Sequence, residues 1–226
     1  MRTRALGALP YLMLACAVAG LGMMQSYMTT PGAVGDTPAI WPDDSGLERS
    51  AGRWTLVLAV HPKCPCTDAS VAELEGVLKA APIAPELVAV VRVPDEPGRT
   101  TGWLDSPLIT ALRRVAEVGA DRLRLIEDPT GEIAASFGAR TSGHAVLFDP
   151  GGAVRFSGGV TASRGMRGPS TGAASIASLL GGREARASRA AVYGCPLCDA
   201  PGPGIDDRRG PPSPDKPARA PEGGTP

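Results

Sequence analysis

The sequence predicts an α/β fold, with a central mixed sheet flanked by helices and preceded by an N-terminal transmembrane helix. A continuous apolar run, residues 54–60, and a second segment of buried-strand type, residues 87–93, are each followed by a segment with helical spacing of its apolar side chains. Strands that alternate with helices imply a mainly parallel sheet with right-handed crossovers. The apolar runs 145–148 and 153–156 flank Asp-Pro-Gly-Gly, which predicts a hairpin that adds an antiparallel edge.

The N-terminus carries an export signal. Arg2 and Arg4 precede an apolar run, residues 5–24, that contains no charge. Twenty helical residues span about 30 Å, the thickness of a bilayer core. No Lys or Arg follows until Arg49, so the positive-inside rule keeps the N-terminal end in the cytoplasm. We therefore expect a single-pass protein of the cell membrane whose folded domain lies on the extracytoplasmic, periplasmic side.

Two other fates of the N-terminal segment stay open. It can be a cleaved signal peptide, although no convincing small-x-small site follows an apolar region of normal length. It can also be lipidated at Cys16, although Met13 stands where Leu is expected and apolar residues continue beyond the cysteine. All three alternatives export the domain.

The rest of the domain follows from periodicity. A helix is predicted after Cys66, with Thr67 as its cap and Pro82 as its stop. The remaining predicted elements are a loop at 94–102, a helix at 107–118, a short strand at 122–126, and helices at 132–137 and 173–180.

Composition divides the chain into regions. We expect an anchor or signal at 1–24, a linker at 25–52, the folded domain at 53–182, a C-terminal extension with a Cys pair at 183–198, and a tail at 199–226. The linker and the tail are rich in Pro and Gly, and the tail has too few apolar side chains to offset its ordering entropy. The tail is therefore predicted to be disordered.

Charge gives no sign of a nucleic-acid partner. The formal net charge is zero, from 23 basic and 23 acidic residues. Basic residues interleaved with aromatic ones, which would indicate nucleic-acid binding, are not found.

The candidate active site is the Cys64-Pro65-Cys66 turn between a buried strand and a helix. A helix N-terminus offers free N–H groups and a partial positive charge, and both favour thiolate over thiol. Lys63 adds a cation next to Cys64, and neutral His61 can accept a proton. Thr67 can hydrogen-bond a sulfur. We therefore assign Cys64, Cys66, His61 and Lys63 to the catalytic set, with Cys64 as the attacking residue.

The spacing of the two cysteines also bears on their chemistry. Cysteines two residues apart can close only a small disulfide ring, which should be strained and easily reduced. Such a bond suits exchange better than permanent stabilisation. The alternative is a small structural disulfide or two unrelated thiols.

These residues resemble the thioredoxin-like superfamily, particularly its membrane-anchored exported members. Residues 54–60, then Pro65-Cys66 and the following helix, resemble the strand, active-site turn and first active-site helix of that fold. Residues 137–152 resemble its second half, so the resemblance covers 53–182. The motifs His-Pro-Lys-Cys-Pro-Cys-Thr and Thr-Ser-Gly-His also resemble the bacterial proteins labelled RedB. The resemblance implies a thiol–disulfide oxidoreductase without a cofactor, acting on protein thiols or disulfides outside the cytoplasm.

The sequence departs from the thioredoxin pattern at two points. Thioredoxins have Cys-x-x-Cys, and aligning Pro65-Cys66 with that motif puts Lys63 where the attacking cysteine should be, with Cys64 one position late. The family's cis-proline position is occupied by Gly143, followed by His144. Loss of that proline removes a barrier to metal capture, so a specialised partner or a metal becomes an alternative.

The alternative function is metal handling. Two thiolates with a neutral imidazole suit copper(I) or zinc, and the ligands would be Cys64, Cys66 and His144. Cys195-Pro196-Leu197-Cys198 gives a second pair, which can act as a redox relay with the first, complete a four-thiolate zinc site, or form a structural disulfide.

A third hypothesis is a non-catalytic adaptor. Its partner face would consist of Gly143, His144, Gly158 and Gly159, because glycines allow close approach of a partner backbone. Arg164 is expected to face water.

Overall fold

The structure is a computed structural model that describes residues 2–93 and 102–197, with residues 2–9 described by their backbone alone. The loop predicted at 94–102 lies almost wholly outside the described residues, as do Cys198 and the tail predicted at 199–226.

The described chain alternates strands with helices, as predicted. In chain order the elements are α1 (Arg2–Thr29), η1 (Asp43–Ser45), β1 (Thr55–Val60), α2 (Pro65–Ala80), β2 (Glu86–Arg92), α3 (Pro107–Gly119), β3 (Arg122–Asp128), α4 (Glu132–Ser136), β4 (His144–Phe148), β5 (Val154–Gly158) and α5 (Thr171–Leu180).

The strands form one mixed sheet in the order β3-β2-β1-β4-β5. β1 pairs in parallel with β2, and β2 with β3, whereas β4 runs antiparallel to both β1 and β5. The hairpin turn is fixed by Asp149, whose carboxylate accepts the N–H groups of Gly151 and Ala153. The predicted fold class, a mixed sheet flanked by helices, is confirmed.

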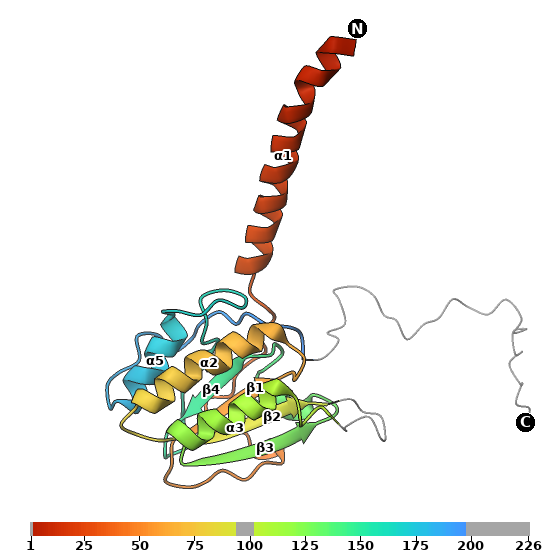
Figure 1. The fold of residues 1–226 in the computed structure, drawn as a ribbon. Helices are drawn as coiled ribbons and strands as arrows, with labels where there is room; N and C mark the ends of the chain where they lie inside the picture. The colour runs from red at the N-terminus through yellow and green to blue at the C-terminus, as the bar shows by residue number, and fades with distance from the viewer. Residues whose placement is uncertain (1, 94–101, 198–226) are drawn as a thin grey trace, which may run out of the picture.

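Helices α2, α3 and α5 cover one face of the sheet, and all three lie on the side nearest the viewer in Figure 1. Side chains of β1 alternate between the two faces: Leu56 and Leu58 pack toward these helices, while Val57 and Ala59 pack against a second cluster that includes α4. β1 is therefore buried on both faces, which accounts for its uninterrupted apolar sequence.

The segment predicted as a linker, 25–52, is instead packed on the domain. α1 continues to Thr29, and Trp41 is only 7 % exposed. The Trp41 ring meets Phe137 and Phe148 edge-on, with ring centroids 5.0 and 4.9 Å away. A single large aromatic side chain buries enough surface to anchor a Pro- and Gly-rich segment without any periodicity. Bridges Val34–Ala139 and Ile40–Ala153 add backbone pairing.

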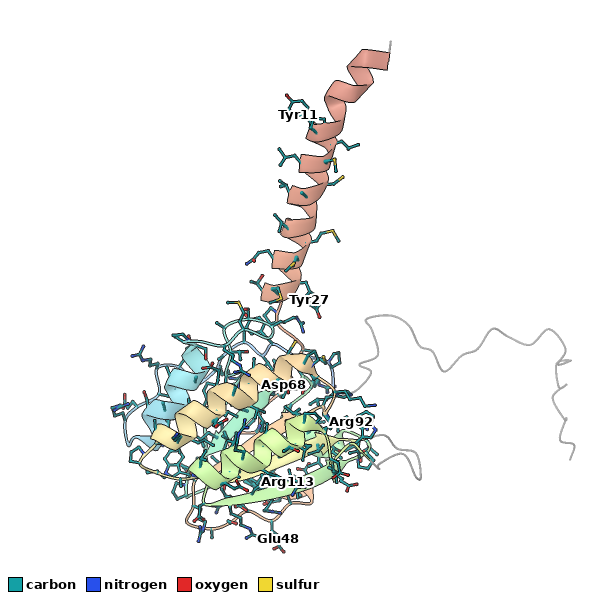
Figure 2. All side chains as sticks on the ribbon, viewed as in Figure 1. Tyr11, Tyr27, Glu48, Asp68, Arg92 and Arg113 are labelled. Atoms are coloured by element: carbon teal, nitrogen blue, oxygen red, sulfur yellow. The ribbon has the colours of Figure 1, made fainter. Side chains whose placement is uncertain are left out.

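Helix α1 projects away from the domain (Figure 1), and Figure 2 shows its side chains pointing outward, with Tyr27 where α1 meets the domain. Residues Pro10–Thr29 form a stretch of 20 residues with a mean hydropathy of 1.3. By length and composition this is long and apolar enough to cross a bilayer, and an N-terminal signal sequence has the same properties. The apolar stretch ends five residues later than the predicted 5–24, because the helix is not interrupted at Met24.

Candidate functional site

The Cys64-Pro65-Cys66 turn lies where β1 ends and α2 begins. The N–H of Cys64 donates to the carbonyl of His61 at 2.9 Å, and Cys64 is the N-cap residue of α2 with Pro65 in its first turn. The predicted cap at Thr67 lies three residues after the actual cap, Cys64, because proline is favoured at the first helical position, where its missing N–H costs nothing. Thr67 therefore lies inside the first turn, and its hydroxyl is free to serve the site.

Hydrogen bonds converge on the Cys64 sulfur, which belongs to a side chain only 2 % exposed. Its Sγ accepts the backbone N–H of Cys195 at 3.3 Å, and the side chains of Thr67 and Cys195 also hydrogen-bond to it. Burial raises the pKa of Cys64, but the hydrogen bonds from Thr67 and Cys195 outweigh it, so the pKa lies below its ordinary value. The arrangement favours a buried thiolate.

A chain of hydroxyl groups supports this sulfur. The backbone N–H of His61 donates to Ser142 Oγ at 2.8 Å, and Ser142 Oγ lies 2.6 Å from Thr67 Oγ1. Each hydroxyl has a single proton to donate. If Ser142 donates to Thr67, the Thr67 proton is left for the Cys64 sulfur. The loop that holds Ser142 therefore helps to orient Thr67.

Gly143 occupies the position where the resemblance expects a cis-proline. Its φ of 87° is one that side-chain-bearing residues rarely adopt, and its N–H donates to the carbonyl of Ala59 at 2.8 Å. A Cβ at this position would lie 3.0 Å from Ser70 Oγ. Gly143 is thus required by the backbone, and it brings the loop close to α2.

The C-terminal extension brings a third cysteine to the site. Ser142 N–H donates to the Cys195 carbonyl at 2.8 Å, and Leu197 N–H donates to the Arg140 carbonyl at 3.0 Å. These bonds hold Cys195 against Cys64, 131 residues earlier in the chain. The sequence paired Cys195 with Cys198, which lies outside the described residues. Two of the alternatives for that pair, the redox relay and the four-thiolate site, required it to approach Cys64 and Cys66, and the structure places Cys195 against Cys64.

The pKa values of the three cysteine thiols shift in different directions. Burial raises the pKa of Cys66, the nearby Cys64 raises it further, and Arg164 opposes both. The pKa of Cys195 rises to about 12, through burial, its hydrogen bond to Cys64 and the charges of Cys64 and Cys66, again against Arg164. Of the three thiols, Cys64 is therefore the one that ionises most readily.

Arg164 does not face water as expected. Its guanidinium donates to the carbonyl of Gly194, and also to those of Tyr27 and Thr30 at 3.1 and 3.3 Å. It stacks over the Tyr27 ring, 4.9 Å from the centroid. A cavity of about 240 Å³, lined by Tyr27, Arg164 and Cys195 among others, adjoins this contact. Arg164 therefore connects the end of α1 with the segment that carries Cys195.

The two predicted helpers of Cys64 have other contacts. The Lys63 ammonium lies over the Trp103 ring, 4.4 Å from its centroid, and the His61 ring packs edge-on against the same ring at 5.4 Å. Burial, Arg92 and Lys63 lower the pKa of His61, which favours its neutral imidazole. His61 is connected to the Cys64 sulfur through its backbone and not through its ring. Its N–H donates to Ser142 Oγ, which contacts Thr67 Oγ1.

The predicted metal ligands Cys64, Cys66 and His144 do not come together. His144 is 1 % exposed, and its Nε2 lies 2.8 Å from Ser157 Oγ. Because side chains alternate along a strand, His144 points to the face opposite Gly143 and α2. Within residues 2–93 and 102–197, no group of three or more His, Cys, Asp or Glu is placed to hold a metal ion.

The predicted partner face is also wrong. Gly143, His144, Gly158 and Gly159 are all buried. A Cβ on Gly158 or Gly159 would collide with the backbone at 190–192 of the same chain. These glycines permit the C-terminal extension, and not a separate protein, to approach closely.

The fold can be compared with known proteins. No known family matches the sequence, and no curated protein matches it. Among solved structures, the chain is similar to an uncharacterised conserved protein from Geobacillus kaustophilus, with 19 % identity, 77 % of this chain and 94 % of that chain covered, and a TM-score of 0.48. A hypothetical protein from Sinorhizobium meliloti has 16 % identity, coverages of 74 % and 93 %, and a TM-score of 0.46. An exposed lipoprotein thioredoxin from Streptococcus pneumoniae has 17 % identity, coverages of 53 % and 77 %, and a TM-score of 0.31. All three structures share less than 20 % identity with this chain and have TM-scores below 0.5.

Thr67→Val tests the hydroxyl chain. Valine matches the shape of threonine but donates no proton, so we expect the pKa of Cys64 to rise. The measurement is the pH dependence of Cys64 alkylation by iodoacetamide, read by mass spectrometry in a Cys66→Ser background. Thr110→Val, the same change on α3, is the control and should leave the profile in place. An unchanged profile in Thr67→Val contradicts the assignment.

His144 should make stability depend on pH. Burial lowers its pKa from 6.5 to about 4, so between these pH values the unfolded chain binds a proton that the native state does not bind. Its contribution is fully present above pH 6.5 and is lost as pH falls toward 4. We expect the free energy of unfolding to fall by about 3 kcal/mol across that window.

The measurement is denaturant unfolding of the detergent-solubilised full chain at a series of pH values. His144→Gln should flatten the acid decline, whereas the control His61→Gln, at a half-buried residue, should retain most of it. An equally steep decline in His144→Gln would rule out this histidine as its source.

Proposed function

We propose that this protein is a membrane-anchored thiol–disulfide oxidoreductase that works outside the cytoplasm, with Cys64 as the attacking thiolate. The observation that carries the proposal is the set of hydrogen-bond donors on the Cys64 sulfur at the start of α2. A thiolate is the nucleophile in thiol–disulfide exchange, and such a microenvironment generates it. The resemblance to RedB-type proteins is part of this proposal.

The working unit we propose is larger than the predicted 53–182. Residues 30–49 and 188–197 both pair with the domain through backbone hydrogen bonds: Gly35 N–H donates to the Gly138 carbonyl, and Ser157 N–H donates to the Ser188 carbonyl, each at 2.9 Å. Because 188–197 supplies a donor to Cys64, a domain cut at 182 would lack part of its site.

The reaction begins with attack by the Cys64 thiolate on one sulfur of a partner's disulfide. The partner's other sulfur leaves as a thiolate, and a mixed disulfide joins Cys64 to the partner. A second thiol of the centre then attacks Cys64 Sγ, releases the partner as a dithiol and leaves an internal disulfide. Two electrons pass from the protein to the partner, and the reverse sequence oxidises a partner dithiol.

Access to the sulfur requires a movement. Cys64 is 2 % exposed, and Cys195 lies directly against it. Partner disulfides therefore reach Cys64 when the segment 194–197 lifts from the loop at 140–142. The segment is held mainly by backbone hydrogen bonds, which water can replace once it opens.

Substitution of Cys64 tests the activity. We expect Cys64→Ser, alone or with Cys66→Ser, to reduce insulin-disulfide reduction by the full chain to the uncatalysed rate, because a hydroxyl does not form the mixed disulfide. The assay uses dithiothreitol as electron donor in detergent. Cys16→Ser in α1 is the control and should retain the wild-type rate. Reductase activity that survives in the double variant sinks the proposal.

Location can be tested with the intact chain. We expect alkaline phosphatase fused after residue 226 to be active, since the enzyme needs an oxidising compartment, and we expect the protein in the membrane fraction. Intact mass then separates the three fates of residues 1–24: full length indicates an anchor, a shortened chain a cleaved signal, and an added lipid mass modification at Cys16. An inactive fusion contradicts export.

A further inference from the structure

We propose that Cys195, and not Cys66, is the thiol that resolves the mixed disulfide on Cys64, so that the oxidised protein carries a Cys64–Cys195 disulfide. The inference rests on the proposed exchange function and names a catalytic residue for it. It also explains why the C-terminal extension is folded back onto the domain.

The first argument is how firmly Cys195 is held. Its backbone N–H donates to Cys64 Sγ at 3.3 Å, and its thiol hydrogen-bonds the same sulfur. Its carbonyl accepts the N–H of Ser142 at 2.8 Å, and the preceding carbonyl, of Gly194, accepts from Arg164. The backbone of Cys195 is thus held on both sides, in direct contact with the Cys64 sulfur.

The second argument concerns Cys66, whose thiol also hydrogen-bonds Cys64. Proximity alone therefore does not separate the two candidates, but the backbone does. Cys66 lies in the first turn of α2, only two residues after the N-cap residue Cys64, so a disulfide between them would close a small, strained ring. Closing a bond between them would distort the start of α2. Cys195 comes from an independent segment that can adjust without disturbing the helix.

The third argument is that the negative charge on Cys64 is lost before Cys195 has to react. While Cys64 is a thiolate, its charge helps to keep Cys195 protonated. Once Cys64 enters a mixed disulfide that charge is gone, and the nearby Arg164 continues to favour the Cys195 thiolate. Loss of the Cys64 charge therefore lowers the pKa of Cys195, while its burial, the largest cause of the raised value, continues to oppose ionisation until the segment opens. The same segment that opened to admit the partner closes to release it.

The steps balance for a partner disulfide RS–SR′. The Cys64 thiolate bonds to the sulfur of R, the S–S bond breaks, and R′S⁻ leaves and takes the proton of Cys195. The Cys195 thiolate then bonds to Cys64 Sγ, the mixed disulfide breaks, and RS⁻ leaves. Two electrons pass from Cys64 and Cys195 to the partner. The partner becomes one thiol, R′SH, and one thiolate, RS⁻.

The experiment uses the full chain in detergent, with Cys16→Ser and Cys198→Ser as background, and dithiobis(nitrobenzoic acid) as the disulfide probe. Trypsin cuts after Lys63, Lys79, Arg189 and Arg208, so Cys64 and Cys66 fall in peptide 64–79 and Cys195 in peptide 190–208. Non-reducing mass spectrometry then shows which peptides are joined.

We expect the background protein to give the two peptides joined by a disulfide, and the link to form also in Cys66→Ser, where only Cys64 can supply it. Cys195→Ser should instead accumulate the probe on peptide 64–79, with a lifetime longer by roughly a hundredfold. Cys66→Ser and Cys195→Ser are matched single-atom changes, and unfolding curves check that each folds.

Other outcomes separate the two proposals. If peptide 64–79 closes an internal disulfide and Cys66→Ser, not Cys195→Ser, accumulates the probe, the resolving role of Cys195 is overturned while the exchange function stands. If no variant takes up the probe at Cys64, the exchange function itself fails.

Discussion

The buried sulfur of Cys64 is the constraint on which the site depends. An anion removed from water costs several kcal/mol unless donors replace its hydration. Here the donors come from separate parts of the chain: Thr67 from α2, and the N–H and thiol of Cys195 from the C-terminal extension. Ser142 acts one step further out, through Thr67. The thiolate is therefore stable only when the extension is docked and the loop at 140–142 is in place.

The C-terminal extension also connects the site to the end of α1. Val192 is buried and its carbonyl accepts from Gly32, just after α1, while Arg164 joins Gly194 to the carbonyls of Tyr27 and Thr30. The segment after α1 is itself held by the ring of Trp41. A movement that lifts Cys195 from Cys64 would consequently disturb the contacts at the end of α1, so the site and α1 share one set of interactions.

What the sequence could predict followed from periodicity. The strands β1 and β2 are uninterrupted apolar runs, and α3 shows regular inward positions, so the sheet and its helices were predicted correctly. Trp41 and Cys195 act through contacts with residues about a hundred or more positions away, and no local pattern reports such pairing. His144 was misplaced for a different reason: its distance from the cysteines depends on which face of β4 it occupies, and that register is set by the turn at Gly143.

The short Cys-Pro-Cys spacing changes where the second thiol must come from. Cys64 is the N-cap of α2, with an extended backbone at φ −89° and ψ 109°, whereas Cys66 already lies in the helix. A disulfide between residues two apart closes only a small ring and would have to fit both backbone conformations, so the short spacing strains such a bond. A third cysteine on a segment that crosses the helix start removes this conflict, since its approach is independent of the helical geometry. The short Cys64–Cys66 spacing and the folded-back C-terminal extension that carries Cys195 are therefore two parts of one arrangement.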